Sequence, residues 1–307
     1  MREQTEAGSR GSEIGESPAA FETSICEADA DAGLQVLLIG DTMHGEFRSA
    51  IEATEQHGAL AIVRDIASAL DELESASTPY SIIIVAQARP GEYSDAEIDA
   101  LRRAAPLAPI VALLGSLCEG EARSGKPWPG VIRVYWHQWR QRAGIELAAL
   151  KAGHSLAWSL PATSSDEERL LVPAPRSFDR RQGLVIIAAK SFEVADWLAD
   201  ACRNRGWAAV RTSAARPIEA DGVAAVLWDA ELTDEANVSE LAAIQASFPG
   251  APIIALADFL RIEQYERLLA LGVAAVLSKP VVLAELSWQL EEAVGAERNG
   301  DCRAPSK

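Results

Sequence analysis

The chain has 307 residues, of which 49% are apolar and 24% are charged, and its formal net charge is −17. This length is sufficient for two domains with separate cores. The acidic charge argues against a nucleic-acid partner, because phosphate backbones are bound by an excess of Lys and Arg. No apolar run approaches the roughly 20 residues that cross a membrane, and the first residues lack the apolar segment of a signal peptide, so we expect a cytoplasmic protein without a membrane partner.

Three segments have the composition of tails or linkers. Residues 1–32 contain eight acidic and two basic residues and few large apolar ones, which predicts a disordered acidic tail. Residues 152–182 contain three prolines and a polar run, which predicts a linker that packs partly through Trp158 and Leu170. Residues 298–307 are polar and predict a second tail.

Between these segments, residues 33–151 and 183–297 share one rhythm of apolar strands and amphipathic helices, which suggests an internal duplication. The predicted strands are 34–39, 60–63, 81–86, 108–114 and 131–136 in the first block, and 184–189, 208–212, 223–228, 251–257 and 273–278 in the second. Alternating strands and helices predict an α/β fold with a parallel sheet. We expect two tandem flavodoxin-like doubly wound domains, each with five strands in the order 2-1-3-4-5 and a site at the carboxyl ends of the strands.

The second block contains the segments "GVAAVLSKPVVLAEL" (272–286), the preceding "YERLLALGV", the strand "PIIALAD", and the strand "VAAVLWD" that ends on Asp229. Through these segments it resembles the receiver (CheY-like) domain of bacterial response regulators. In that family an aspartate after the third strand accepts a phosphoryl group from a histidine kinase, and a lysine before a cis-proline contacts the phosphate. The resemblance implies that Asp229 matches the phosphoacceptor, Lys279 the lysine and Pro280 the cis-proline.

Other receiver positions are missing from the second block. The acidic pair that holds Mg²⁺ in the family falls on Ala188 and Ala189, and the Thr or Ser after the fourth strand falls on Ala257. Since alanine offers no ligand to a metal, we expect neither a metal nor a cofactor. Lys279 is then expected to form a standing ion pair with Asp229, with Lys190 nearby.

The first block departs further from the receiver pattern. Gly40 and Asp41 follow its first strand, so one of the two acids is expected to survive. Its third strand places Ala86, or Gln87 if the register slips by one residue, where the acceptor aspartate belongs. Leu114 replaces the Thr or Ser, and no Lys-Pro step follows the fifth strand. The chain is therefore expected to contain two degenerate tandem receiver-like domains.

Two regions are candidates for interaction. Residues 116–142 interleave cations with aromatic side chains, among them Trp128, Trp136, Trp139 and Arg140. The alternatives for this region are a core strand whose tryptophans seal a domain junction, a protein interface, and a nucleic-acid surface that the net charge opposes. The second region is the face that receivers use for signalling, represented here by Gln264, Arg267, Leu268, Ser278, Leu286 and Trp288.

The predicted function is that of a phosphorylation-independent signalling or scaffold protein of the two-component type, with no catalytic residues. A protein partner is expected, either a histidine kinase or another signalling protein, and a homodimer is left open. One alternative is a phosphoacceptor response regulator that uses Asp229 and a Mg²⁺ ion held by acids such as Glu231, Asp234 or Asp258. The other alternative is a small-ligand or nucleotide sensor at the strand rim, which the fold permits but does not require.

Overall fold

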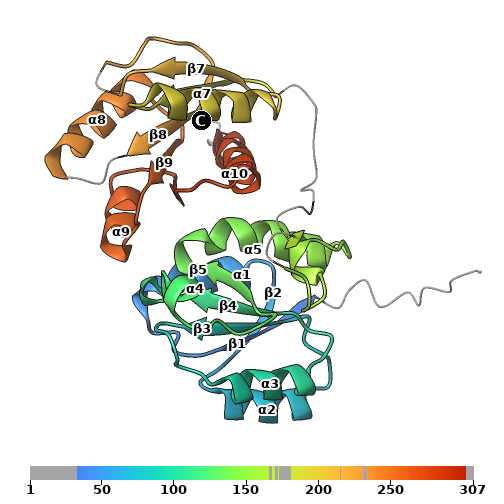
Figure 1. The fold of residues 1–307 in the computed structure, drawn as a ribbon. Coiled ribbons are helices and arrows are strands. Elements are labelled where there is room, and N and C mark those ends of the chain that lie inside the picture. The colour runs from blue at the N-terminus through green and yellow to red at the C-terminus, as the bar shows by residue number, and fades with distance from the viewer. Residues whose placement is uncertain are drawn as a thin grey trace, which may run out of the picture. The chain divides into compact units, whose positions relative to one another are not determined.

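The computed structural model describes residues 33–165, 168–169, 172, 181–214, 216–230 and 234–301, and the side chains of most of them. Two α/β lobes lie within this range: the first lobe, residues 33–151, and the second lobe, residues 183–297. Each lobe contains one five-stranded parallel sheet with helices on both faces (Figure 1). No helix of the described residues is long and apolar enough to span a membrane.

The sheet of the first lobe has the strand order β2-β1-β3-β4-β5. Its strands are β1 (Leu34–Ile39), β2 (Gly58–Val63), β3 (Ile82–Gln87), β4 (Ile110–Leu114) and β5 (Ile132–Tyr135). Its helices are α1 (Arg48–Glu55), α2 (Ile66–Ser75), α3 (Asp95–Ala104), α4 (Glu121–Ser124) and α5 (Trp136–Lys151). Helices α2 and α3 lie together on one face of the sheet, and α1 and α5 lie together on the other (Figure 1).

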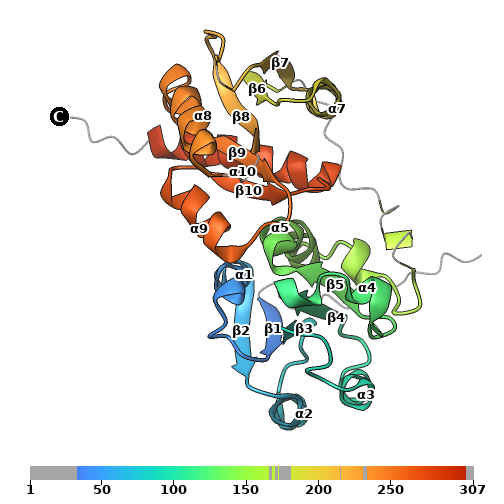
Figure 2. The same ribbon diagram turned by 60° about the vertical axis from the view of Figure 1, so that its left-hand side comes forward.

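The sheet of the second lobe has the strand order β10-β9-β8-β6-β7, which is the same topology. Its strands are β6 (Leu184–Ala188), β7 (Ala208–Thr212), β8 (Val223–Ala230), β9 (Ile253–Ala257) and β10 (Ala275–Ser278). Its helices are α7 (Phe192–Arg203), α8 (Asp234–Ser247), α9 (Ile262–Ala270) and α10 (Leu283–Asp301), and Figure 2 shows them from a second direction. The predicted fold class and strand order 2-1-3-4-5 are confirmed in both lobes.

The strands form where the sequence is continuously apolar, because a parallel sheet covered on both faces buries every side chain. All six residues of β3 and all five of β4 and β9 are buried. Two predicted strands, 34–39 and 208–212, match their observed bounds. The prediction for 131–136 was too long at its carboxyl end, since Trp136 is the first residue of α5.

Helix ends follow capping chemistry. The predicted capping box of α3 is present: the Ser94 hydroxyl accepts from the backbone N–H of Glu97, and the Glu97 carboxylate accepts from the backbone N–H of Ser94. Two such bonds satisfy donors that a helix otherwise leaves unpaired at its start. Asp65 caps α2 and Ser191 caps α7 through their side chains, so these helices begin at residues suited to the role.

The segment between the lobes packs through Trp158, as predicted, and this side chain is 1% exposed next to Trp139. Leu170, the second predicted contact, lies outside the described residues. The predicted acidic tail, residues 1–32, also lies outside them. The predicted tail at 298–307 begins differently, because α10 continues to Asp301, and the residues after it are not described.

Candidate functional site

The most conspicuous charge arrangement lies at the carboxyl ends of the strands in the second lobe. Lys279 follows β10, and its Nζ lies 2.7 Å from Oδ1 of Asp229 and 2.8 Å from Oδ2 of Asp258. Asp229 belongs to β8, and Asp258 directly follows β9. Three neighbouring strands therefore bring together two carboxylates and one ammonium group, here called the Lys279 bridge. The expected Lys279–Asp229 ion pair is confirmed, and Asp258 extends it.

The backbone holds the lysine in this position. The Lys279 backbone N–H donates to the carbonyl of Ala257 at 2.8 Å, which continues the pairing of β10 with β9. The bond between Lys279 and Pro280 is cis, as the resemblance implied. The sheet registers place Asp229 opposite Leu256, one residue before the end of β9. The geometry of the bridge is thus set by strand pairing.

Burial differs between the two carboxylates of the bridge. The side chain of Asp229 is 10% exposed and that of Asp258 is 57% exposed, while that of Lys279 is 22% exposed. Burial by itself lowers the pKa of Lys279, but the hydrogen bonds to Asp229 and Asp258 outweigh it, and the resulting pKa lies above the usual 10.5. Lys279 therefore stays charged at neutral pH and supplies a fixed cation to the strand rim.

The rest of the rim has no metal ligand where the family holds Mg²⁺. Ala188, Ala189 and Ala257 are buried at the ends of β6 and β9, with exposed fractions of 0%, 5% and 0%. Within the described ranges, no three His, Cys, Asp or Glu side chains lie close enough to hold a metal ion. Mg²⁺ requires several hard oxygen ligands, and alanine has none. The residues present at these positions do not fit the ion.

Three other acids were candidates for holding Mg²⁺, and the structure describes the side chain of one of them. Asp258 contacts Lys279, Glu231 lies outside the described residues, and nothing is described of the Asp234 side chain. Lys190, predicted near the bridge, lies 3.6 Å from Oε1 of Glu240 on α8.

The first lobe differs from the second at each corresponding position. Its strand registers match Ala86 with Asp229, because Ala86 faces the penultimate residue of β4 as Asp229 faces that of β9. By the same alignment Ile39 and Gly40 match Ala188 and Ala189. The expectation that Asp41 survives as one of the acids was wrong by one residue. Asp41 instead accepts a hydrogen bond from the backbone N–H of Met43 in the turn after β1.

Gly40, the first-lobe residue that matches Ala189, is closely surrounded. Gly40 adopts φ +128°, and a Cβ atom there would lie 2.7 Å from the Ala86 carbonyl oxygen and 3.0 Å from the Tyr93 hydroxyl. Only glycine tolerates both this backbone and this proximity. Tyr93 is 9% exposed, and burial raises the pKa of its hydroxyl to about 12. There is no room at this point of the first lobe for a carboxylate side chain.

A buried hydrogen-bond network occupies the neighbouring part of the first lobe's rim. Oε1 of Glu46 accepts from the Ser116 hydroxyl at 2.5 Å, and Oε2 accepts from the Ser116 backbone N–H at 2.9 Å. The indole Nε1 of Trp136 donates to the same hydroxyl at 3.0 Å. Trp136 follows β5 directly, as Lys279 follows β10, so a tryptophan stands where the second lobe has its lysine.

Sequence reasoning missed Glu46 and Ser116. They are 70 residues apart, and neither belongs to a motif. The only signal was an acidic residue in the loop after the first strand and a hydroxyl shortly after the fourth, a pattern too common to be singled out.

The tryptophans of residues 116–142 are core residues. Trp128, Trp136 and Trp139 are 8%, 2% and 0% exposed. The Trp139 indole donates to Thr54 Oγ1 at 3.0 Å, which ties α5 to α1. Their prediction as interaction residues is therefore corrected, because burying large aromatic surface in the core is the stronger driving force. Arg140, which directly follows Trp139 in sequence, remains exposed.

The predicted signalling face of the second lobe is partly occupied by α5 of the first lobe. Arg142 Nε lies 2.7 Å from Glu285 Oε1, and Gln141 Nε2 donates to Gln289 Oε1 at 3.2 Å. The Trp288 ring lies against Gly144, where a Cβ atom would be 2.4 Å from it.

On α9, the next helix of this face, Arg267 is exposed and Gln264 is half-buried. The Gln264 side-chain oxygen accepts from the Arg261 backbone N–H at 3.1 Å, so the amide is used locally. Of the predicted face, Arg267 and Gln264 thus remain accessible, while Trp288 packs within the chain.

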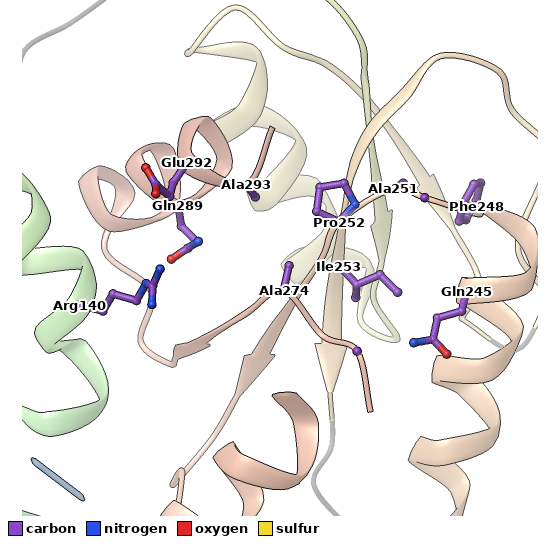
Figure 3. Close-up of a pocket in the computed structure, with 12 residues that line it drawn as sticks. Arg140, Gln245, Phe248, Ala251, Pro252, Ile253, Ala274, Gln289, Glu292 and Ala293 are labelled. Atoms are coloured by element: carbon purple, nitrogen blue, oxygen red, sulfur yellow. The ribbon is translucent and has the colours of Figure 1, made fainter. Parts of the chain in front are cut away.

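A cavity of about 690 Å³ lies at the opposite end of the second lobe's sheet. Ala251, Pro252 and Ile253 line it where β9 begins, and Arg140, Gln289 and Glu292 form another side of it (Figure 3). The Lys279 bridge lies where β9 and β10 end, so this cavity does not belong to the rim.

No family model and no curated protein matches the sequence. Among solved structures, a CheY-like receiver domain protein from Methanospirillum hungatei JF-1 is 16% identical, with a TM-score of 0.34 over 39% of this chain and 99% of that chain. A receiver domain protein from Clostridium thermocellum is 13% identical, with a TM-score of 0.34 over 38% of this chain and 98% of that chain. A structure described as a probable two-component system response regulator/GGDEF domain protein is 16% identical, with a TM-score of 0.35 over 86% of this chain and 99% of that chain. These three structures are described as receiver or response-regulator proteins.

Proposed function

We propose that the chain is a non-enzymatic signalling protein of the two-component type that acts by binding a protein partner and works without being phosphorylated. The observation that carries this proposal is the Lys279 bridge, in which one ammonium group contacts both carboxylates of the rim. A receiver uses phosphorylation to shift a population between two arrangements. Here the ammonium group of Lys279 lies beside Asp229, and we expect the second lobe to keep this one arrangement without phosphorylation.

Phosphoryl transfer to Asp229 would lack its usual support. The reaction relies on a divalent cation that neutralises charge on the phosphoryl oxygens. The positions that would anchor this cation are Ala188 and Ala189, and Lys279 already binds one oxygen of Asp229. The first lobe presents Ala86 instead of an acceptor. Neither lobe is therefore proposed to carry a phosphoryl group.

The partner is proposed to be a protein, a histidine kinase or another signalling protein, with a homodimer as the remaining alternative. Arg267 and Gln264 on α9 are the accessible residues of the expected face. Alanine substitution at both positions should weaken partner binding by at least tenfold if this surface is used. Unchanged binding would exclude this face.

The test of the central claim is intact-protein mass spectrometry after incubation with phosphoramidate and Mg²⁺. Wild type and Asp229→Ala should each keep the mass calculated for its own sequence, with no added phosphoryl group. A magnesium-dependent gain of one phosphoryl group in wild type, absent from Asp229→Ala, would contradict the proposal and establish Asp229 as a working acceptor. A matched gain-of-function variant, Ala188→Asp with Ala189→Asp, restores the missing acids. Phosphorylation of this variant alone would identify the absent metal ligands as the cause.

A further inference from the structure

A second cavity, of about 580 Å³, is lined by residues of β5, of α5 between positions 138 and 146, of the segment that follows α5, and of the start of α10. Its apolar wall includes Ile132, Ile145, Leu156, Trp158 and Val282. Its volume is in the range of small-molecule sites, which commonly combine apolar walls with a few placed polar groups. None of the residues of the Lys279 bridge lines it, and it takes no part in the proposed function.

Three arginines and two glutamates also line this cavity: Arg133, Arg142, Arg169, Glu146 and Glu285. Their formal charges sum to one positive charge. Fully formed apolar sites rarely contain five charged groups, since burial of a charge is costly unless it is paired. Glu121 pairs with Arg133 from outside the lining, so the charges around the cavity balance. The two glutamates of the wall would oppose a doubly charged phosphate more strongly than a single carboxylate.

Two of the arginines have donors to spare. Arg133 uses Nη1 to bind Glu121 Oε2 at 2.8 Å, but its Nη2 is buried and has no hydrogen-bond partner among the described residues. Arg142 binds Glu285 through Nε at 2.7 Å. A buried guanidinium donor without a partner needs an acceptor, because an unpaired buried donor loses the hydrogen bonds that water would supply. An acceptor supplied by a ligand would satisfy it.

We propose that this cavity binds a small organic monocarboxylate with an aromatic or branched apolar body. The body would pack between Trp158 and the aliphatic side chains, and the carboxylate would accept from Arg133 or Arg142. Guanidinium groups suit this role because their planar fork matches a carboxylate. A bare inorganic anion would gain nothing from the apolar wall.

The proposed site connects parts of the chain that are distant in sequence. Ile132 and Ile145 belong to the first lobe, Leu156 and Trp158 to the segment after it, and Val282 lies three residues beyond Lys279. A ligand that contacts all of them stabilises the arrangement by its binding free energy. The cavity is therefore a point at which a metabolite would act on both lobes, independently of phosphorylation.

The test is isothermal titration calorimetry of the full chain with 2-naphthoate as the probe and 2-naphthylmethanol as its uncharged counterpart. We expect saturable one-to-one binding of the carboxylate, and binding of the alcohol at least tenfold weaker. Ile145→Trp, which fills the cavity, and Arg142→Gln, which removes a cation, should each weaken naphthoate binding at least tenfold. Arg140→Gln is the matched control, since Arg140 lies on the same helix but lines the other cavity (Figure 3).

Several results would overturn the assignment. They are no binding at millimolar probe, equal binding of the alcohol, undiminished binding by Ile145→Trp, or a loss in Arg140→Gln instead of Arg142→Gln. Circular dichroism of each variant shows whether it folds. If Arg142→Gln does not fold, Ile145→Trp decides the outcome, because it leaves every ion pair in place. Phosphorylation of Asp229 has no bearing on this result, so the two proposals fail separately.

Discussion

The two lobes share one topology but treat the carboxyl ends of their strands in opposite ways. The second lobe keeps an open rim with charged groups, where Lys279 binds a buried and an exposed carboxylate. The first lobe closes the same place with Gly40, Tyr93 and the hydrogen bonds between Glu46, Ser116 and Trp136. A receiver-like sheet therefore does not require an ion pair at the carboxyl ends of its strands. In the first lobe, hydrogen bonds to one carboxylate and buried aromatic side chains occupy the same place.

The largest effect is expected from opening the closed rim of the first lobe. Gly40→Ala introduces a Cβ atom 2.7 Å from a backbone oxygen at a φ of +128°. Both the contact and the backbone conformation are unfavourable, and we expect a loss of about 3 kcal/mol in the free energy of unfolding, measured by urea denaturation. Gly91→Ala is the control, since φ is +74° there but no atom lies within 4 Å. It should lose about 1 kcal/mol from the backbone alone. Equal losses in the two variants would show that the first lobe's rim is not tightly packed.

An intermediate effect is expected from removing one carboxylate of the Lys279 bridge at a time. Asp229→Asn removes the buried carboxylate and leaves Lys279 with the exposed one, so we expect a loss of about 2 kcal/mol in the free energy of unfolding. Asp258→Asn removes the exposed carboxylate, and its loss should be about 0.5 kcal/mol. Thermal or urea unfolding of the two variants, measured side by side, gives the ratio of their losses in the free energy of unfolding. A larger loss from Asp258→Asn would reverse the assignment of the principal partner.

The smallest effect is expected from raising the pH until the Lys279 ammonium group loses its proton. The pKa of Lys279 is raised in the folded chain, so its contribution to stability is complete below the unfolded pKa of 10.5 and is lost as the pH rises through the folded value. The difference in melting temperature between wild type and Lys279→Met should therefore be constant from pH 7 to about pH 10 and shrink above it. A difference that shrinks already between pH 7 and 9 would be inconsistent with a charged Lys279 at the rim.

Much of the second lobe's rim was predictable. Asp229, Lys279 and the cis bond to Pro280 followed from the resemblance of "GVAAVLSKP" and "VAAVLWD" to a receiver, and the structure confirms their positions. The contact of Lys279 with Asp258 was not predicted, since Asp258 had been considered only as a metal ligand. Its role depends on how far β9 and β10 extend, which sequence patterns locate only to within a few residues.

Less of the first lobe's rim was predictable. The substitution at Ala86 was seen, but Asp41 was assigned one residue out of register, because an apolar run does not mark which of its residues ends the strand. Trp128, Trp136 and Trp139 were candidates for an interface or for the core, and they are buried. Tryptophans that alternate with cations occur both at protein interfaces and in cores, so composition does not separate the two. The packing of α5 against α1 shows that these tryptophans belong to the core.

The sequence by itself determined the strands, their alternation with helices and hence the parallel topology, because side chains buried on both faces of a sheet must be apolar in every position. It also determined that Ala188 and Ala189 cannot bind a metal ion, since an alanine side chain has no donor atom in any conformation. Only the tertiary structure decided that Glu46 and Ser116 meet, that Lys279 binds two carboxylates, and that five charged residues surround one apolar cavity. Those outcomes depend on distances between residues far apart in the chain, and such distances are set by packing and register rather than by local pattern.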